Sequence, residues 1–241
     1  MRETVLVLVC KRPAPGHGKQ RLAGVLGDPA AERIANLLLA CALEDCESWP
    51  GPVVIAPSRP GDRAWASTLL SKAMVIPQSG GNLGERLNVL DRVLRGRGFS
   101  RIVYMGSDAP GLTPPDFFLI REALDHHDIA LAPARDGGVV LMGSRRPWPD
   151  LGRLPWSAAG LGERLSDLCR AEGLTAVLLG TGFDVDHPED LLTVLSALEE
   201  DLRPARRAFR SLAGRLLSTA PAGLWRERGS GYGAGKGDGS S

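Results

Sequence analysis

The amino-acid sequence predicts an α/β protein with one mostly parallel β-sheet flanked by helices. Short runs of β-branched residues and leucine, typical of strands buried on both faces, alternate with segments whose apolar residues recur at helical spacing. Glycine-rich polar motifs stand directly after several of these runs, where a strand would end and a helix begin. Strands that alternate with helices in this way indicate βαβ units, and therefore parallel strands.

The first strand is expected at residues 4–10, an uninterrupted apolar run. Asp28 and Pro29 then predict the start of a helix, because aspartate caps helix N-termini and proline fits the first turn. One face of that helix is apolar at helical spacing: Ile34, Leu37, Leu38 and Cys41. Further strands are expected at residues 52–56, 73–77 and 101–105, separated by a short helix near 63–71 and a longer one from Leu83.

The second half of the chain continues the alternation. Thr113 followed by Asp116 predicts a helix start with a capping-box acid. Strands are expected at residues 129–133, 139–142 and 175–179, and helices at 161–171 and 188–200. We therefore expect one α/β domain over residues 1–202, a basic amphipathic helix over 203–228 and a disordered Gly/Ser-rich tail over 229–241. The basic helix is expected to dock on the domain rather than to bind a membrane or nucleic acid.

The composition is that of an ordinary globular protein, with 241 residues of which 43% are hydrophobic and 24% charged. A formal net charge of +1 gives no broad attraction for nucleic acid, so nucleic acid is not an expected partner. The four cysteines form no CxxC pair, which favours buried, reduced thiols over a zinc site. The N-terminal apolar run is too short for a membrane span and lacks the features of a signal peptide, so we expect a cytoplasmic protein with no membrane span.

A basic loop follows the first predicted strand and carries four cations: Lys11, Arg12, Lys19 and Arg21. Prolines and glycines interrupt it, namely Pro13, Pro15, Gly16 and Gly18. Glycine lets backbone N–H groups approach phosphate oxygens, and lysine neutralises phosphates as a point charge. The loop lacks the spacing of a P-loop. A solvent-exposed connector is the alternative, but the position directly after the first strand favours phosphate binding.

Two aspartates are candidate ligands for a divalent cation. Asp108 follows the strand expected at 101–105, and Asp186 lies in an acidic stretch before the last helix of the domain. Carboxylate oxygens, completed by substrate phosphates, are usual ligands of Mg²⁺ in proteins. Structural roles are the alternatives, a turn for Asp108 and a helix cap for Asp186. Because two acids flank one basic loop, we expect them to bind Mg²⁺ or Mn²⁺.

Two further motifs contain paired glycines. The Asp136-Gly137-Gly138 motif fits equally well a hairpin turn and a backbone segment that contacts a nucleobase or an acceptor. Gly80, Gly81 and Arg86 belong to a loop that could close over the base or sugar of a nucleotide, although Arg86 could instead pair with an acid on its own helix face. No Ser/His/Asp arrangement or HExxH motif supports a hydrolase.

In combination, these motifs resemble a family of bacterial proteins with the GT-A nucleotide-diphospho-sugar transferase fold. Its members are known as glycosyltransferase-like proteins, or as transferases associated with radical-SAM and selenium-domain clusters or arsenosugar synthesis. The pattern is K-x-P-x-P-G-x-x-K-T-R-L, Q-x-G-x-x-L-G-E-R, G-x-D-x-P-G-L, D-G-G, W-S and D-V-D-T-P-E-D-L, matched in order over about residues 4–195. The chain is also similar to phospholactate guanylyltransferases and molybdenum-cofactor nucleotidyltransferases.

The resemblance implies a single Rossmann-like GT-A domain. It further implies that the first loop holds a triphosphate and that Asp108 and Asp186 hold the metal. The sequence departs from the pattern at three positions: Gln20 and His187 replace threonines, and Val139 replaces an aromatic residue.

These observations predict a metal-dependent enzyme that passes a nucleotidyl group from a nucleoside triphosphate to a small phosphorylated or phosphonylated acceptor, releasing pyrophosphate. Lys19, Arg21 and Asp108 are the expected catalytic residues. The basic loop favours this reaction because a triphosphate needs more cations around it than a diphosphate sugar. The first alternative is a glycosyltransferase using a nucleotide-diphospho-sugar, with Asp136 as base, and the second is a non-catalytic nucleotide-binding module. The sequence is also compatible with a homodimer.

Overall fold

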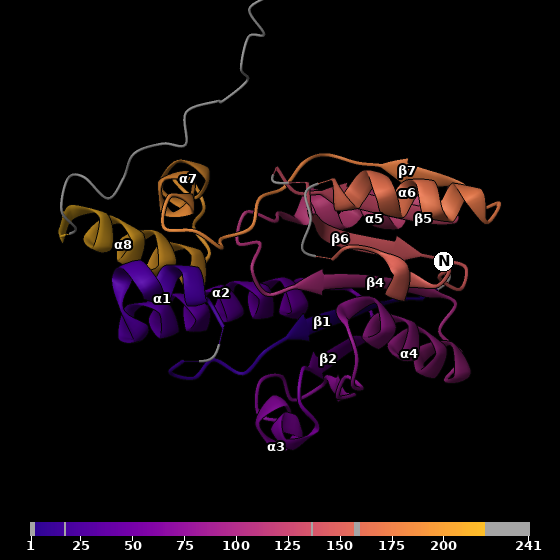
Figure 1. Ribbon diagram of the computed structural model, residues 1–241, viewed down its shortest axis with the longest axis horizontal. Helices are drawn as coiled ribbons and strands as arrows, with labels where there is room; N and C mark the ends of the chain where they lie inside the picture. The colour runs from indigo at the N-terminus through magenta and orange to yellow at the C-terminus, as the bar shows by residue number, and fades with distance from the viewer. Residues whose placement is uncertain (1–2, 17, 136, 157–159, 220–241) are drawn as a thin grey trace, which may run out of the picture.

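The computed structural model describes residues 3–16, 18–135, 137–156 and 160–219, in which seven strands form one sheet (Figure 1). The strand order is β3-β2-β1-β4-β6-β5-β7. The strands are β1 Thr4–Cys10, β2 Val53–Pro57, β3 Met74–Val75, β4 Arg101–Gly106, β5 Ile129–Pro133, β6 Val139–Ser144 and β7 Ala176–Leu178. β6 runs antiparallel to β4 and β5, and the other neighbouring pairs are parallel. The predicted mostly parallel sheet is therefore confirmed.

Helices cover both faces of the sheet. They are α1 Gln20–Leu26, α2 Asp28–Ser48, α3 Arg63–Ala66, α4 Leu83–Gly96, α5 Pro114–His126, α6 Leu161–Ala171, α7 Asp190–Ala197 and α8 Pro204–Thr219. Leu6 and Leu8 of β1 pack with α2, α3 and α5 on one face, whereas Val5 and Val7 pack with α4 and α6 on the other. This double burial explains why β1 is an uninterrupted apolar run.

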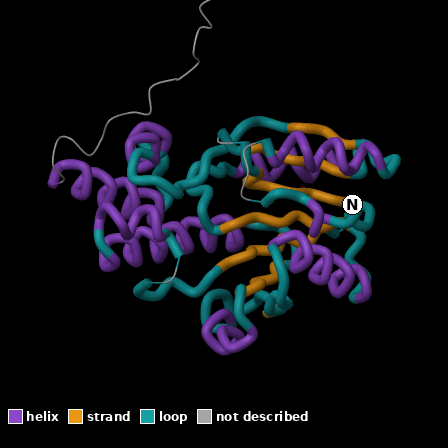
Figure 2. Tube along the Cα trace, in the orientation of Figure 1, coloured by secondary structure: helices purple, strands orange, loops and turns teal. Residues whose placement is uncertain are grey.

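A third apolar cluster joins α1, α2, α7 and α8, which gather at one end of the molecule (Figure 2). Ile34 of α2, Val194 of α7 and Phe209 of α8 are fully buried in it. α8 thus packs on α2 and α7 through an apolar stripe. None of the helices in the described residues is long and apolar enough to cross a membrane.

β1 and β4 lie side by side, and their carboxyl ends coincide because Val9 is paired with Gly106. From β1 the sheet extends to β2 and β3 on one side and to β4 on the other, so the strand order reverses between β1 and β4. Open α/β sheets bind ligands in the crevice at such a reversal. The register therefore brings the basic loop after β1 next to the Asp108 segment after β4.

Several predicted elements are corrected by the structure. α1 lies where the sequence indicates only a loop, because seven residues with one buried leucine give too short a periodic signal. Asp28 is the first residue of α2 rather than its cap, a position taken by Gly27. The helix expected near 63–71 is α3, and the strand expected at 73–77 is the two-residue β3. All four cysteines are buried and free, as the sequence predicts.

Candidate active site

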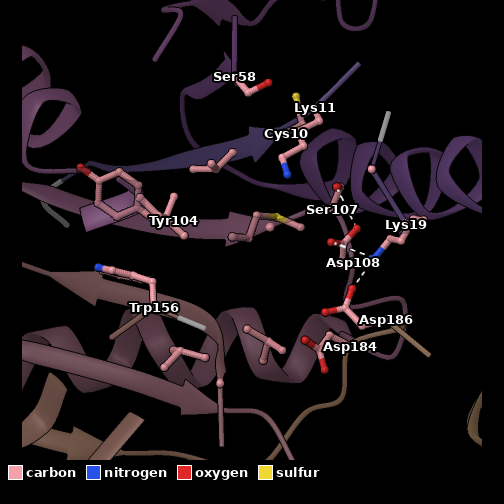
Figure 3. A pocket seen from close by; sticks show the side chains of 18 of the residues that line it. Cys10, Lys11, Lys19, Ser58, Tyr104, Ser107, Asp108, Trp156, Asp184 and Asp186 are labelled. Carbon is pink, nitrogen blue, oxygen red and sulfur yellow. Dashed lines mark hydrogen bonds and ion pairs between the residues drawn. The ribbon is translucent and has the colours of Figure 1, made fainter. Parts of the chain in front are cut away.

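A cavity of about 610 Å³ lies at the sheet edge where β1 and β4 end (Figure 3). Its walls come from the basic loop after β1, from residues 106–108 after β4, and from the loop that precedes α7. Ser58 and Gln78, just beyond β2 and β3, and Arg86 of α4 complete this side. The basic loop and the acidic segments predicted to form a site therefore meet around one cavity.

Lys19 joins the two candidate metal ligands. Its Nζ donates hydrogen bonds to the carbonyl oxygen of Val185 at 2.7 Å and to Asp186 Oδ1 at 2.9 Å, and lies 2.9 Å from Asp108 Oδ2 (Figure 3). The Lys19 side chain is 8% exposed, whereas those of Asp108 and Asp186 are 45% and 43% exposed. The carboxylates are therefore open to the cavity while the ammonium group is held between them.

The backbone of Lys19 is left-handed, with φ 50° and ψ 36°, at the residue that precedes α1. It is the one non-glycine residue with positive φ in the described part of the chain. Such a conformation costs about 1–3 kcal/mol and concentrates at functional sites. The Gln20 side chain donates a hydrogen bond to the Gly16 carbonyl at 2.8 Å, so the residue that replaces threonine braces the loop.

The electrostatics of this cluster favour the charged forms of Lys19 and Asp186. Burial alone would raise the pKa of Asp186. The charge and the hydrogen bond of Lys19, together with the charges of Arg21 and His187, outweigh burial and hold this pKa below its usual value. Burial lowers the pKa of Lys19, but the attraction of Asp108 and Asp186 is larger, so that pKa is raised. One ammonium and two carboxylates leave a formal charge of minus one, which suits a further cation.

The two acidic loops are fixed to each other. The Val185 N–H donates to the Asp108 carbonyl oxygen at 2.9 Å. Asp190 Oδ2 accepts hydrogen bonds from the N–H groups of Asp186 at 2.8 Å and His187 at 2.6 Å. The sequence left open whether Asp186 caps the last helix, but in the structure Asp190 binds these N–H groups and the Asp186 carboxylate faces Lys19.

Further cations surround the cluster. Lys11, Arg12 and Arg21 line the same cavity. Arg21 Nη1 lies 3.0 Å from His187 Nε2, so the histidine that replaces threonine contacts a basic residue of the loop. The cavity thus presents positive charge from one loop opposite negative charge from two, which is the arrangement expected for a polyphosphate bound together with a metal ion.

Arg86 is held by the loop that precedes its own helix. Its Nη1 donates to Gln78 Oε1 at 3.0 Å, and its Nε donates to the Asn82 carbonyl at 3.3 Å. Gln78 in turn donates to the Ala56 carbonyl at 2.7 Å. Arg86 therefore reaches a polar residue that lines the cavity rather than an acid of its own helix.

The structure brings most of the predicted site residues together. Those that line the cavity are Lys11, Gly18, Lys19, Arg21, Arg86, Asp108, Gly138 and Asp186. The other predicted glycines and proline shape the loops outside the lining: Pro15, Gly16, Gly80, Gly81 and Gly137. Gly137 donates its N–H to the Ala134 carbonyl at 2.9 Å, in the turn that joins β5 to the antiparallel β6. Asp136 lies outside the described residues.

Several lining residues were not among the predicted site residues. Tyr104, Met142 and Trp156 form an apolar part of the cavity, and Asp184 joins its acidic part. The Trp156 indole donates to the Leu151 carbonyl at 2.9 Å, which fixes its ring. Sequence signals existed for two of them, since Trp156 belongs to the W-S motif and Asp184 stands two residues before Asp186.

The residues fit a magnesium or manganese ion. Both carboxylates already approach one cationic atom, Lys19 Nζ, at 2.9 Å. In the described residues no group of three or more His, Cys, Asp or Glu side chains could hold a metal. Mg²⁺ commonly uses one or two carboxylates and takes its remaining ligands from substrate phosphates and water. Asp108 and Asp186 therefore suit an ion that arrives with a phosphate-bearing ligand.

Solved structures identify the fold. A protein from Desulfovibrio desulfuricans G20, named provisionally as a nucleotide-diphospho-sugar transferase, is 24% identical with a TM-score of 0.82, over 90% of this chain and 98% of that one. A cytidylyltransferase from Leptospira borgpetersenii is 13% identical with a TM-score of 0.53, over 90% and 96%. CMP:2-keto-3-deoxy-manno-octonic acid synthetase, solved with CTP, is 12% identical with a TM-score of 0.50, over 84% and 100%. The fold is that of the GT-A nucleotide-diphospho-sugar transferases and nucleotidyltransferases.

The sequence also matches a family model. Residues 39–158 match the family described as "Uncharacterized protein conserved in bacteria (DUF2064)". No curated protein matches the sequence. The resemblance drawn from the motifs is thus confirmed at the level of family and fold.

Proposed function

We propose that the protein is a metal-dependent nucleotidyltransferase, which passes a nucleotidyl group from a nucleoside triphosphate to a small phosphorylated or phosphonylated acceptor. The observation that carries the proposal is the Lys19 ammonium group between Asp108 and Asp186, at the edge of a cavity lined by further basic side chains. This combination provides positive charge for a triphosphate and two carboxylates for a metal ion, at the sheet edge where α/β folds bind nucleotides.

Each residue has a defined part in this reaction. Asp108 and Asp186 would hold Mg²⁺ or Mn²⁺, which when bound neutralises the α-phosphate and makes it a better electrophile. Lys19, Arg21 and Lys11 would stabilise the charge that develops on the departing pyrophosphate. Arg86 and the Gly80-Gly81 loop would contact the base or the sugar. Such catalysis consists mainly of positioning and electrostatics, so no protein nucleophile is required.

The acceptor side of the cavity is assigned to Gly138, at the end of the turn between β5 and β6, and to Trp156, both of which line the cavity. Gly138 contributes backbone with no side chain to obstruct an acceptor. A phosphate or phosphonate oxygen is already negatively charged, so it can attack the α-phosphate without a general base. The proposed reaction therefore needs no further titratable residue on this side.

Glycosyl transfer is the second candidate, favoured by the name given to the Desulfovibrio desulfuricans protein and by the high similarity of its fold. It would use the same two carboxylates. An attacking hydroxyl group would require a base, for which Asp136 is the candidate. A module that binds nucleotides without turnover is the third candidate.

The test is a panel of the four nucleoside triphosphates and common UDP-, GDP- and CDP-sugars, each with Mg²⁺ or Mn²⁺. Binding is followed by thermal shift and turnover by pyrophosphate release. Asp108→Asn should abolish both signals. Asp167→Asn is the matched control, because this acid is 76% exposed on α6 and lies outside the cavity lining.

The outcomes separate the three candidates. A metal-dependent shift and pyrophosphate release with one triphosphate support nucleotidyl transfer and identify the base. Release of nucleoside diphosphate from a nucleotide sugar, with no use of a triphosphate, supports glycosyl transfer. A shift without any product supports the binding module.

A further inference from the structure

Arg206 of α8 is a fully buried charged side chain, with 0% exposure. Its Nη2 donates to both carboxylate oxygens of Asp45, at 2.8 and 2.7 Å. Its Nη1 donates to Glu44 Oε2 at 3.0 Å and to the Cys41 carbonyl at 2.6 Å. Arginine is almost never fully buried unless it is paired, and these bonds pair it and tie α8 to α2.

The same guanidinium group also holds the segment that follows Asp108. Its Nε donates to the Pro110 carbonyl at 3.2 Å, and its Nη2 donates to the Leu112 carbonyl at 3.2 Å. Arg203, the residue just before α8, donates to the same Leu112 carbonyl at 2.8 Å and to Asp45 Oδ1 at 2.8 Å. Arg206 of α8 and Arg203 just before α8 therefore hold the backbone just beyond a candidate metal ligand.

That segment is in turn coupled to the loop of the second acid. The Asp108 carbonyl accepts the Val185 N–H at 2.9 Å. Gly111 lies so close to the Phe183 ring that a Cβ at this position would overlap it. Because the two loops touch through backbone as well as side chains, a shift of residues 109–112 would change the distance between Asp108 and Asp186.

Stability alone is a weak reason for burying this charge. Replacing a buried ion pair with apolar side chains is often neutral or stabilising, since desolvation of the charges offsets their attraction. An apolar side chain at position 206 could not donate to Pro110, whose buried carbonyl would then lose its hydrogen-bonding energy, and the Leu112 carbonyl would keep only the hydrogen bond from Arg203. Arg206 supplies what an apolar residue cannot, namely the donor to the Pro110 carbonyl and a second donor to the Leu112 carbonyl.

From this geometry we infer that Arg206 is a positioning residue for the acid pair: through Pro110 and Leu112 it sets where Asp108 lies relative to Asp186 and Lys19. α8 then belongs to the functional unit although it contributes no side chain to the cavity lining. The consequence for turnover rests on the proposed function, whereas the consequence for loop order does not.

The experiment compares three variants with the wild-type chain. Arg206→Lys keeps the charge but loses the fork that reaches Asp45 and both carbonyls together. The double variant Arg206→Met/Asp45→Leu replaces the buried pair with apolar groups. Arg210→Met is the control, because Arg210 also lies on α8 but bonds to Leu195 and Glu199, far from the Asp108 segment in the chain. Amide hydrogen exchange of residues 106–113 and 183–187 is measured at 15 °C, together with kcat and KM for pyrophosphate release.

We expect both Arg206 variants to exchange at least tenfold faster in these two segments and to lose at least tenfold in kcat. KM for the nucleotide should change less than threefold, because the basic loop is untouched. Arg210→Met should match the wild type in every measurement. Wild-type exchange rates in both Arg206 variants would overturn the inference, and so would chains that are unfolded at 15 °C, since Arg206 would then serve the fold as a whole. If no triphosphate is turned over, the proposed function fails while the exchange comparison still decides the positioning role.

Discussion

Replacement of Lys19 with methionine tests the centre of the candidate site. Methionine keeps the unbranched side chain but removes the ammonium group that bonds to Val185, Asp186 and Asp108. The two carboxylates then face each other without an internal cation. We expect opposite effects on two measurements, with turnover falling and metal binding by the free protein becoming tighter.

The expected magnitudes follow from the contacts. Loss of one cation that stabilises the transition state costs about 10² to 10³ in kcat, or roughly 2.7–4 kcal/mol. Each ion pair joins the buried ammonium to a carboxylate that is almost half exposed, so solvent screening limits it to about 0.2–1 kcal/mol. In Lys19→Met a metal ion no longer has to displace these two ion pairs. Their combined free energy of about 0.4–2 kcal/mol corresponds to roughly 2- to 30-fold tighter metal binding.

The assay is Mn²⁺ binding to the nucleotide-free protein by electron paramagnetic resonance, combined with steady-state pyrophosphate release. Lys72→Met serves as the control, because Lys72 is exposed and lies outside the cavity lining. Weaker Mn²⁺ binding in Lys19→Met, or turnover within twofold of wild type, would refute the reasoning that Lys19 both shields the acids and serves the departing group.

Three further predictions concern the surroundings of the site. The pKa of Asp186 lies below the usual 3.8. Its ion pair therefore stabilises the fold fully above pH 3.8, and this stabilisation is lost as the pH falls through the lower pKa of the folded state. Titration of the carboxylate by NMR should show a midpoint below 3.8, and a midpoint at or above 3.8 would contradict the prediction. Asp190→Ala removes the carboxylate that accepts hydrogen bonds from the N–H groups of Asp186 and His187. Urea denaturation should therefore show a loss of about 1.5–3 kcal/mol in the free energy of unfolding. An unchanged urea midpoint would contradict this prediction. Gly84→Ala places a Cβ against the Leu151 carbonyl and the Trp156 indole. Urea denaturation should show a loss of about 1–3 kcal/mol in the free energy of unfolding. A stability equal to that of the wild type would show that Leu151 and Trp156 move aside without cost.

Elements whose pattern reflects burial were predictable from the sequence. β5 and α6 cover residues 129–133 and 161–171, as expected from their apolar patterns. α1 and β3 were poorly predicted because they are short, and their formation depends on neighbours distant in the chain. Leu22 of α1, for example, is buried only by packing in the cluster that α2, α7 and α8 build.

The same division applies to the site. Lys19, Asp108 and Asp186 could be predicted from the sequence because each lies in a polar motif that follows a strand or precedes a helix. Asp190 and Arg206 were not recognised, since their roles depend on contacts between distant segments. A signal for Arg206 did exist: it precedes Phe209 by three residues and Ala213 by seven, which places an arginine on the apolar face of its helix.

The wide separation of the site residues along the chain has a consequence for synthesis. Lys19 and Asp186 are 167 residues apart, and Arg206 meets Cys41 across 165. A chain growing from its N-terminus can form β1 and α2 early, but it cannot assemble the acid cluster until the segment around Asp186 has left the ribosome. Such long-range contacts form late and slowly. Under the proposed function, nucleotide binding should therefore report the completed fold, and a nascent chain halted before α7 should bind no nucleotide even when its sheet has begun to form.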